Sequence, residues 1–240
     1  MDLTLIVVVA AIVAVASLLG GLSGFGYGLV AAPSLLAVGV PMPTIVLLNL
    51  GLGIITRGVA LARLRRHVTR RATLLVAGSL PGYSVGALLL GRIDTEVLKV
   101  ATGAIVIVLA LVSLAMRKPA YQPAKGSFFF AGAAGGLLGA TTSLNGVVPA
   151  LVMTQARPPS REFIADLAAF FVGSSIFGLV AVLVGGISAP HGWLLLAISV
   201  PGSVAGNLIG TCAGTRLPAH VFRTIALFVV ICAGVAAILA

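Results

Sequence analysis

The stretch Pro81-Gly82-Tyr83-Ser84-Val85-Gly86 has a second version, Pro201-Gly202-Ser203-Val204-Ala205-Gly206, in the other half of the 240-residue chain. From position 81 to position 201 the shift is 120 positions, and each stretch lies inside a long apolar segment. Two copies with so long a period do not fit solenoids or propellers, whose units run to roughly 20–50 residues. They are typical of the internal repeats of secondary transporters. The sequence therefore predicts a duplicated membrane protein.

Other matches extend the repeat along the chain. Gly21-Leu22-Ser23-Gly24 corresponds to Gly136-Leu137-Leu138-Gly139, and Pro33 corresponds to Pro149, so the shift drifts between about 115 and 120 positions. Small loop insertions would produce such a drift. We therefore expect a first repeat in residues 1–118, a cytoplasmic linker in 119–125 and a second repeat in 126–240.

Composition indicates that the solvent for most of the chain is lipid. Sixty per cent of the residues are hydrophobic and 8% are charged, against about 25% charged in an ordinary soluble domain. Apolar stretches of about 18 residues or more can cross a bilayer as helices. Seven stretches qualify: 3–20, 44–61, 72–90, 97–116, 164–184, 193–212 and 221–240. The expected fold is an all-α polytopic membrane protein with two inverted repeats and about eight to ten spanning or re-entrant segments.

The basic residues predict the orientation. Six arginines lie between Arg57 and Arg71, and Arg117, Lys118 and Lys125 lie between the two halves, so the positive-inside rule places both loops in the cytoplasm. The loop at 185–193, which aligns with the first of these, contains no Lys or Arg and should be external. Equivalent loops on opposite sides predict inverted repeats with an odd number of crossings each and two external termini. The charge therefore indicates topology, and no nucleic-acid partner is expected.

Several other classes of function lack support in the sequence. The Ala14-Val15-Ala16 stretch resembles a signal-peptidase site, but a basic segment before it is missing, so residues 1–20 are interpreted as an uncleaved first helix. The three histidines have no ligand-type partner at helical spacing, and no base is placed to activate a serine or threonine. We expect no metal site, no cofactor and no enzymatic activity.

Two glycine-rich stretches, at 20–28 and 132–146, interrupt the helical pattern at matching places. Both should be non-helical in part. The apolar segments after them, 29–40 and 147–155, are too short to span the bilayer. Paired interruptions of this kind indicate a transporter's binding site, where helix starts and bare backbone N–H groups attract anions. Close helix packing by small residues is the alternative. The predicted substrate-binding residues are Ser23, Gly24, Gly26, Tyr27, Gly28, Asn49, Thr141, Thr142, Ser143, Asn145 and Gly146.

Asp166 is the one acidic residue embedded in an apolar segment, and Asn49 falls near the equivalent position of the first half. The two side chains could face one cavity, with Asp166 as a proton carrier. Pairing of Asp166 with Arg161 or Arg57 at the cytoplasmic end is an equally open alternative.

The glycine-rich openings followed by proline-containing short segments (20–33 and 135–149), the Pro-Gly-x-x-x-Gly of each later helix and the basic loop at Ala62-Arg63-Leu64-Arg65-Arg66 together resemble the TauE/SafE family of anion exporters. The resemblance covers essentially the whole chain. It implies a carrier in the plasma or inner membrane for small sulfur-containing anions such as sulfite or sulfoacetate, driven by a proton or potential gradient. In the second half, hydroxyls and an amide replace part of the family's glycine run.

The sequence thus predicts a secondary transporter, an exporter by family resemblance, that works by alternating access. An anion channel of the same fold and a membrane scaffold without transport are the alternatives. The expected partners are a small anion and the lipid bilayer, and the sequence leaves a homo-oligomer open.

Overall fold

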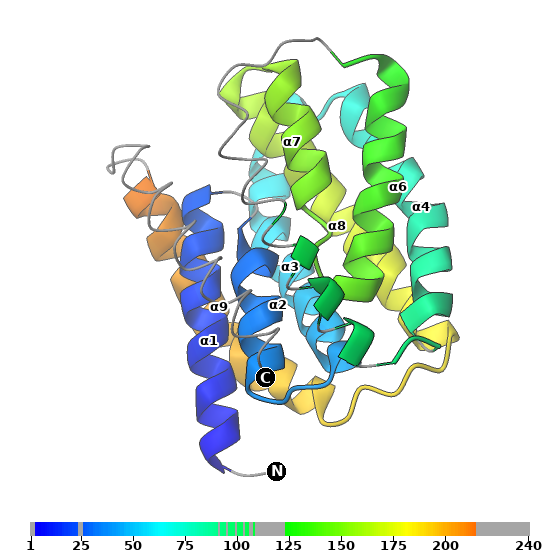
Figure 1. The fold of residues 1–240 in the computed structure, drawn as a ribbon. Coiled ribbons are helices and arrows are strands. Elements are labelled where there is room, and N and C mark those ends of the chain that lie inside the picture. The colour runs from blue at the N-terminus through cyan, green and yellow to red at the C-terminus, as the bar shows by residue number, and fades with distance from the viewer. Residues whose placement is uncertain are drawn as a thin grey trace. The chain divides into compact units, whose positions relative to one another are not determined.

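The computed structural model describes residues 3–23, 26–90, 92–94, 96–98, 100–102, 104–105, 108 and 123–214. Throughout these residues the regular structure is helical (Figure 1). The predicted crossing at 97–116 and the linker at 119–125 lie largely outside the described residues, and the predicted crossing at 221–240 lies wholly outside them.

In the described part of the chain, five helices are long and apolar enough to cross a membrane, which confirms the predicted helical membrane protein. Their bounds are α1 Leu3–Ser23, α3 Met42–Leu64, α4 Arg70–Leu90, α8 Ser160–Val184 and α9 Gly192–Gly214. A 3-10 turn, η1 (Arg65–His67), joins α3 to α4. The two predicted short segments are helices α2 (Tyr27–Ala37) and α7 (Val147–Ala156), with 11 and 10 residues. Helix α6 spans Lys125–Thr142.

The glycine-rich stretches are more helical than the sequence predicts. Helix α1 continues through Ser23, and α6 continues through Thr142, so the second interruption is confined to residues 143–146. Gly132 and Gly136 lie inside α6, where a Cβ would overlap the carbonyl groups of Leu75 and Ser79 on α4. Close packing therefore overrides the low helix propensity of glycine, and for these two residues the packing interpretation was right.

The chain forms two compact units. Unit 1 consists of residues 1–48, 93–114 and 188–240, and unit 2 of residues 49–92 and 115–187. Each unit draws on both halves of the sequence, so the units differ from the two predicted repeats. The repeat boundaries and their inverted relationship remain predictions.

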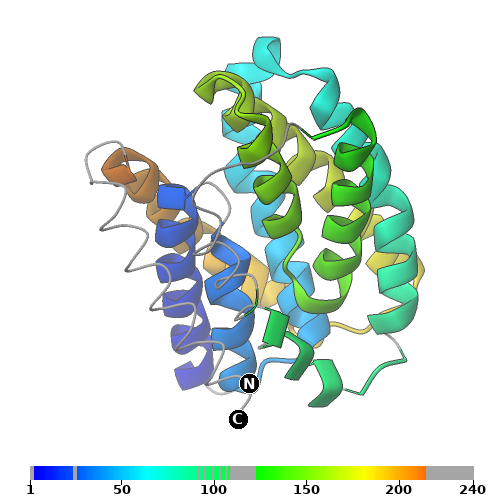
Figure 2. The same ribbon diagram turned by 45° about the horizontal axis from the view of Figure 1, so that its top comes forward.

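Unit 1 contains α1, α2, the start of α3 and α9. Helix α9 runs beside α1 along much of its length (Figures 1 and 2). The hydroxyls of Ser17 on α1 and Ser203 on α9 are hydrogen-bonded at 2.7 Å between the two Oγ atoms and are buried. At another point Thr44 Oγ1 donates to the carbonyl oxygen of Pro190 at 3.2 Å. Hydroxyl bonds and small residues thus hold this apolar unit together.

Unit 2 contains the rest of α3 with α4, α6, α7 and α8. Three of its helices begin at the same end. Arg70 of α4 shares one groove with Gly126 and Phe128 of α6, and Glu162 of α8 forms an ion pair with Arg71 of α4. Helices α4, α6 and α8 therefore all run from that end toward the other.

Helices α6 and α7 form a hairpin that returns to the end at which it began. Gly135 of α6 lies against Pro149 of α7, and Asn145 lies in the turn between them. Helix α7 ends at Ala156, only four positions before α8 begins at Ser160. The α6–α7 hairpin is consequently re-entrant within unit 2. The short length of α7 alone does not show whether the segment spans or re-enters.

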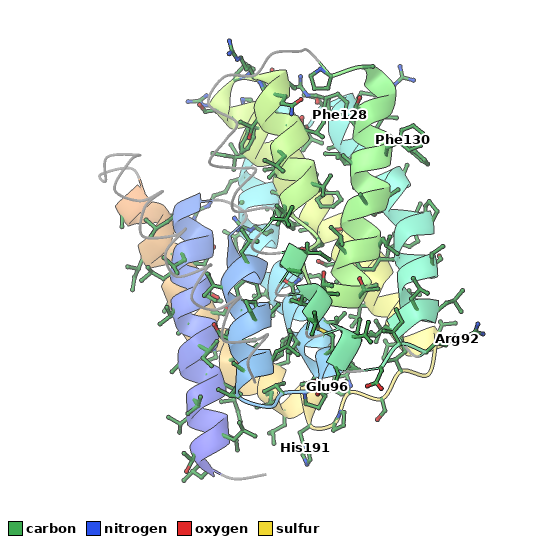
Figure 3. All side chains as sticks on the ribbon, in the orientation of Figure 1. Arg92, Glu96, Phe128, Phe130 and His191 are labelled. Atoms are coloured by element: carbon green, nitrogen blue, oxygen red, sulfur yellow. The ribbon has the colours of Figure 1, made fainter. Side chains whose placement is uncertain are left out.

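The end of unit 2 at which α4, α6 and α8 begin is strongly basic, and we call it the basic end. Arg71 contacts Glu162 and Asp166 there. Arg92 lies at the other end of α4 and projects outward, while Phe130 projects from α6 near the basic end (Figure 3). The arginines of the basic end are Arg63, Arg65, Arg66, Arg70, Arg71, Arg157 and Arg161.

Candidate functional site

The turn between α6 and α7 has an unusual backbone. Ser143 ends α6 with φ 62°, in the left-handed region that non-glycine residues seldom adopt. The amide of Leu144 then donates to the carbonyl oxygen of Leu138 at 3.2 Å, which closes the end of the helix. Helix α7 starts after Gly146 with no side-chain cap. Its first N–H groups therefore lack a capping side chain at the positive end of the helix dipole.

Asn49 of α3 ties this turn to the rest of unit 2. Its Nδ2 donates to the carbonyl oxygen of Ser143 at 2.7 Å and lies 3.5 Å from Oδ1 of Asn145. Both asparagines are almost fully buried, with 6% and 5% of their surfaces exposed. The structure thus brings together three residues that the sequence predicted for the site, Asn49, Ser143 and Asn145, with Gly146 next along the chain.

Thr141 and Thr142 are placed differently. Each hydroxyl donates to the carbonyl oxygen four residues earlier in α6, Leu137 for Thr141 and Leu138 for Thr142, at 2.8 Å in both cases. Such internal bonds are usual for hydroxyls in apolar helices. Neither threonine can donate to an anion while this bond is made.

Tyr83 of α4 belongs to the same cluster, although the sequence analysis did not select it. Its side chain is 1% exposed, and its hydroxyl makes no hydrogen bond of ordinary geometry with a described protein group. The hydroxyl lies near the side chains of Asn145 and Ser174. Tyr83 stands in the repeated hexapeptide, so the sequence did draw attention to it, but as a repeat marker and not as a polar group.

The first predicted cluster lies in unit 1. The side chain of Ser23 and the whole of Gly24 fall outside the described residues. Helix α2 begins at Tyr27 after Gly26 without a side-chain cap, and Gly28 is buried in its first turn. The Tyr27 hydroxyl is buried and makes no hydrogen bond with a described protein group. An uncapped short helix beside a buried tyrosine hydroxyl therefore occurs in each unit.

Asp166 does not lie with Asn49 at the α6–α7 turn. Its carboxylate is fully buried and accepts hydrogen bonds from the amide and hydroxyl of Thr69, at 2.6 and 2.7 Å, and from Nε of Arg71 at 3.1 Å. The expectation that Asp166 and Asn49 face one cavity is therefore wrong. The alternative, an ion pair between Asp166 and an arginine at the basic end, is observed, but the partner is Arg71 and not Arg161 or Arg57.

The side chains of the turn cluster are buried. Two open grooves of unit 2, of about 480 and 410 Å³, lie elsewhere: one between the ends of α4 and α8 at Arg92, and one at Arg70 and Phe128. Neither is lined by a residue of the α6–α7 turn. Within the described part of the chain, no three His, Cys, Asp or Glu residues gather as metal ligands would.

Comparison with protein families gives one decisive result. The model of the family described as sulfite exporter TauE/SafE matches residues 9–237, nearly the whole chain. The chain belongs to the TauE/SafE family. The comparison with curated proteins and the comparison with solved structures each gave no match. This TauE/SafE protein is accordingly a membrane protein of a transporter family, and within the described residues its α6–α7 hairpin holds a polar turn between two apolar helices.

Proposed function

We propose that this TauE/SafE protein carries small sulfur-containing anions, such as sulfite and organosulfonates, out of the cell by alternating access. The observation that carries the proposal is the α6–α7 turn, where Asn49 binds Ser143 beside Asn145, directly before an uncapped helix start inside an apolar unit. Irregular backbone at membrane depth is tolerated where it lines a cavity or is buried in protein. Short half-helices whose starts point at anionic groups are a recurring transporter device.

The depth of the turn supports this assignment. Helix α7 has ten residues, so it is about 15 Å long at 1.5 Å per residue. That length is about half of a hydrocarbon core of roughly 30 Å. If the basic end lies at the membrane surface, the turn reaches the middle of the bilayer, where alternating-access carriers hold their substrates.

The charge distribution supports an orientation with the basic end in the cytoplasm. In that orientation α4 and α8 both lead outward, and the start of the α8–α9 loop lies at the opposite end of unit 2 from the α3–α4 connection. These are the loops that inverted repeats would place on opposite sides. The orientation and the external termini are part of the proposal, as is a location in the plasma or inner membrane.

Asp166 receives a structural role in this proposal. Three hydrogen bonds, one of which is also the ion pair with Arg71, already hold its carboxylate at the start of α4. A carboxylate in this position accepts hydrogen bonds at a helix N-terminus and stabilises it. Proton coupling, if transport shows it, is not assigned to this residue.

The proposal is tested by uptake of labelled sulfite, sulfoacetate, taurine, sulfate and acetate into proteoliposomes, with and without an imposed pH gradient. Saturable flux of a sulfur oxyanion is expected, and Asn145→Leu should reduce it while leaving the protein folded. Unchanged flux in that variant would remove Asn145 from the site. Gradient-independent current without saturation would indicate a channel, and a silent wild-type protein would contradict transport of these anions.

The same assay separates the two readings of Asp166. Asp166→Asn should lower the yield of folded protein because it weakens the bonds to Thr69 and Arg71, while the protein that does fold keeps any response to the pH gradient. Folded protein that transports the anion but no longer responds to the gradient would restore Asp166 as a proton carrier.

A further inference from the structure

We propose that the hydroxyl of Tyr83 donates a hydrogen bond to the transported anion and that the cluster around it selects singly charged sulfur oxyanions over dianions. The inference rests on the proposed function and adds a recognition residue and a charge preference to it. It starts from a buried hydroxyl that lies near the side chains of Asn145 and Ser174 but makes no hydrogen bond of ordinary geometry among the described residues.

Tyr83 is held in a slot made by two glycines. A Cβ on Gly139 of α6 would lie 2.9 Å from Cζ of the ring, and a Cβ on Gly178 of α8 would lie 2.6 Å from its Cε1. Any side chain at either position would displace the ring. Three helices thus fix the tyrosine with its hydroxyl between Gly139 and Asn145.

The unpaired hydroxyl needs an explanation, because burying a polar group without a hydrogen bond costs free energy. Phenylalanine would fill the same slot without that cost. Ser174, close to the ring, directs its own hydroxyl at the carbonyl oxygen of Phe171 at 3.4 Å, and Ser175 is a second buried hydroxyl without a partner. Each unsatisfied buried group of this kind calls for an explanation, and a ligand that accepts its hydrogen bond is one.

The amide of Asn145 is a second polar group beside the Tyr83 hydroxyl. The bond from Nδ2 of Asn49 to the Ser143 carbonyl fixes the orientation of the Asn49 amide, and Asn49 in turn faces Oδ1 of Asn145. Because Oδ1 of Asn145 faces Asn49, the Nδ2 group at the other side of the Asn145 amide points away from Asn49. Together with the uncapped start of α7, it makes a site rich in donors, which suits sulfonate oxygens because they only accept.

The cluster has no full positive charge of its own. Asn49, Tyr83, Asn145, Ser174 and Ser175 are all neutral. The guanidinium of Arg57 on α3 lies against the Phe171 ring, 5.4 Å from its centre. Neutral donors and helix dipoles can compensate one buried charge far better than two. Organosulfonates and hydrogen sulfite fit the site, whereas sulfate does not.

The test compares wild type with Tyr83→Phe in proteoliposomes and in thermal unfolding with added methanesulfonate or sulfate. The variant should unfold at the same or a higher temperature without anion. Its KM for methanesulfonate should rise about tenfold or more, the effect of losing one hydrogen bond to a charged group. Methanesulfonate should stabilise wild type more than the variant, and sulfate should stabilise neither.

Ser84→Ala is the matched control, since the neighbouring Ser84 is exposed and donates only within α4, to the Leu80 carbonyl; its KM should not change. An unchanged KM in Tyr83→Phe would overturn the inference and leave the proposed function standing. A lower unfolding temperature with a parallel loss of flux would show a structural role and overturn it as well. Wild type without flux or anion-dependent stabilisation would overturn both proposals.

Discussion

The α1–α9 pair of unit 1 and the α4–α6 pair of unit 2 are packed alike. In each pair the helices run in the same direction and meet through glycines four positions apart, where a Cβ would overlap a carbonyl oxygen of the partner helix. This is the small-xxx-small packing of membrane helices. The glycines are Gly78 and Gly82 on α4 and Gly206 and Gly210 on α9.

The residue contacts of the α1–α9 pair match those of the α4–α6 pair when two constant shifts in residue number are applied. One shift relates α1 to α6, and the other relates α4 to α9. Gly82 lies against the carbonyl of Ala133, and Gly210 lies against that of Leu18. The shift from 18 to 133 is 115 positions, and the shift from 82 to 210 is 128 positions. Both shifts also relate the Gly21–Asn207 contact of unit 1 to the Gly136–Ser79 contact of unit 2. The shift of 115 is one that the sequence predicted for the first helix of each half.

The shift of 128 corrects the alignment of the two hexapeptides. Aligned at 120, Gly82 matches Gly202, yet Gly202 lies eight positions, about two helical turns, before the structural counterpart Gly210. A Cβ on Gly202 would lie 3.4 Å from the Ala14 side chain, which is ordinary contact. The Pro-Gly match therefore identified the correct helices but the wrong register.

One position differs between the pairs. Where Gly132 meets the backbone of Leu75, the corresponding place in unit 1 holds Ser17 and Ser203, joined by their hydroxyls at 2.7 Å. A close backbone contact in one pair is replaced by a side-chain hydrogen bond in the other. The two helix pairs thus pack in the same way although the interaction at this position differs.

The largest effect is expected for Gly82→Leu and Gly210→Leu, made separately. Each places a branched side chain against a partner carbonyl, and overpacking of this severity costs about 3 kcal/mol or more. We expect little folded protein by size-exclusion chromatography in detergent from either variant. Gly58→Leu is the control, because a Cβ there meets nothing within 4 Å. Normal yields of both variants would contradict the shared packing.

A finer test of register compares Gly82→Ala with Gly202→Ala. The first should destabilise by about 1–3 kcal/mol through overlap with Ala133. The second should be neutral or stabilise by up to about 1 kcal/mol through helix propensity. Thermal unfolding in the same detergent measures both. Equal losses would favour the shift of 120 and argue against that of 128.

The smallest effect concerns the serine pair. Ser17→Ala or Ser203→Ala should cost about 0.6 kcal/mol, the average for a hydrogen bond between membrane helices. The double variant should cost little more than either single one, because the two hydroxyls share one bond. A double-mutant cycle from thermal unfolding gives the coupling, and additive losses would show that the bond adds nothing.

Much of the fold could be predicted from the sequence because lipid imposes simple rules. Continuous apolar length predicted α1, α3, α4, α8 and α9, and insufficient length predicted α2 and α7. The extent of the glycine interruptions was overestimated, since a residue such as Gly136 is a helix breaker by propensity and a packing residue only in the presence of α4. No local sequence pattern distinguishes a glycine that ends a helix from one that packs against another helix.

The candidate site was predictable where it depends on the turn and unpredictable where it depends on distant helices. Ser143 and Asn145 stand in a visibly polar break. The role of Tyr83 requires Gly139 and Gly178, which lie 56 and 95 positions after it in the chain. These glycines leave space for the Tyr83 ring only when α4, α6 and α8 have packed together. Asp166 likewise met Arg71, 95 positions away, because α4 and α8 begin at the same end.

The interleaving of the two halves also determines the order in which the protein can be assembled. Ser17 and Ser203 are 186 residues apart, and at roughly 5–20 residues per second the ribosome takes about 10–40 s to make that interval. Helix α1 is therefore made well before its partner α9. Its small-residue face is meanwhile open to lipid, chaperones or a neighbouring nascent chain.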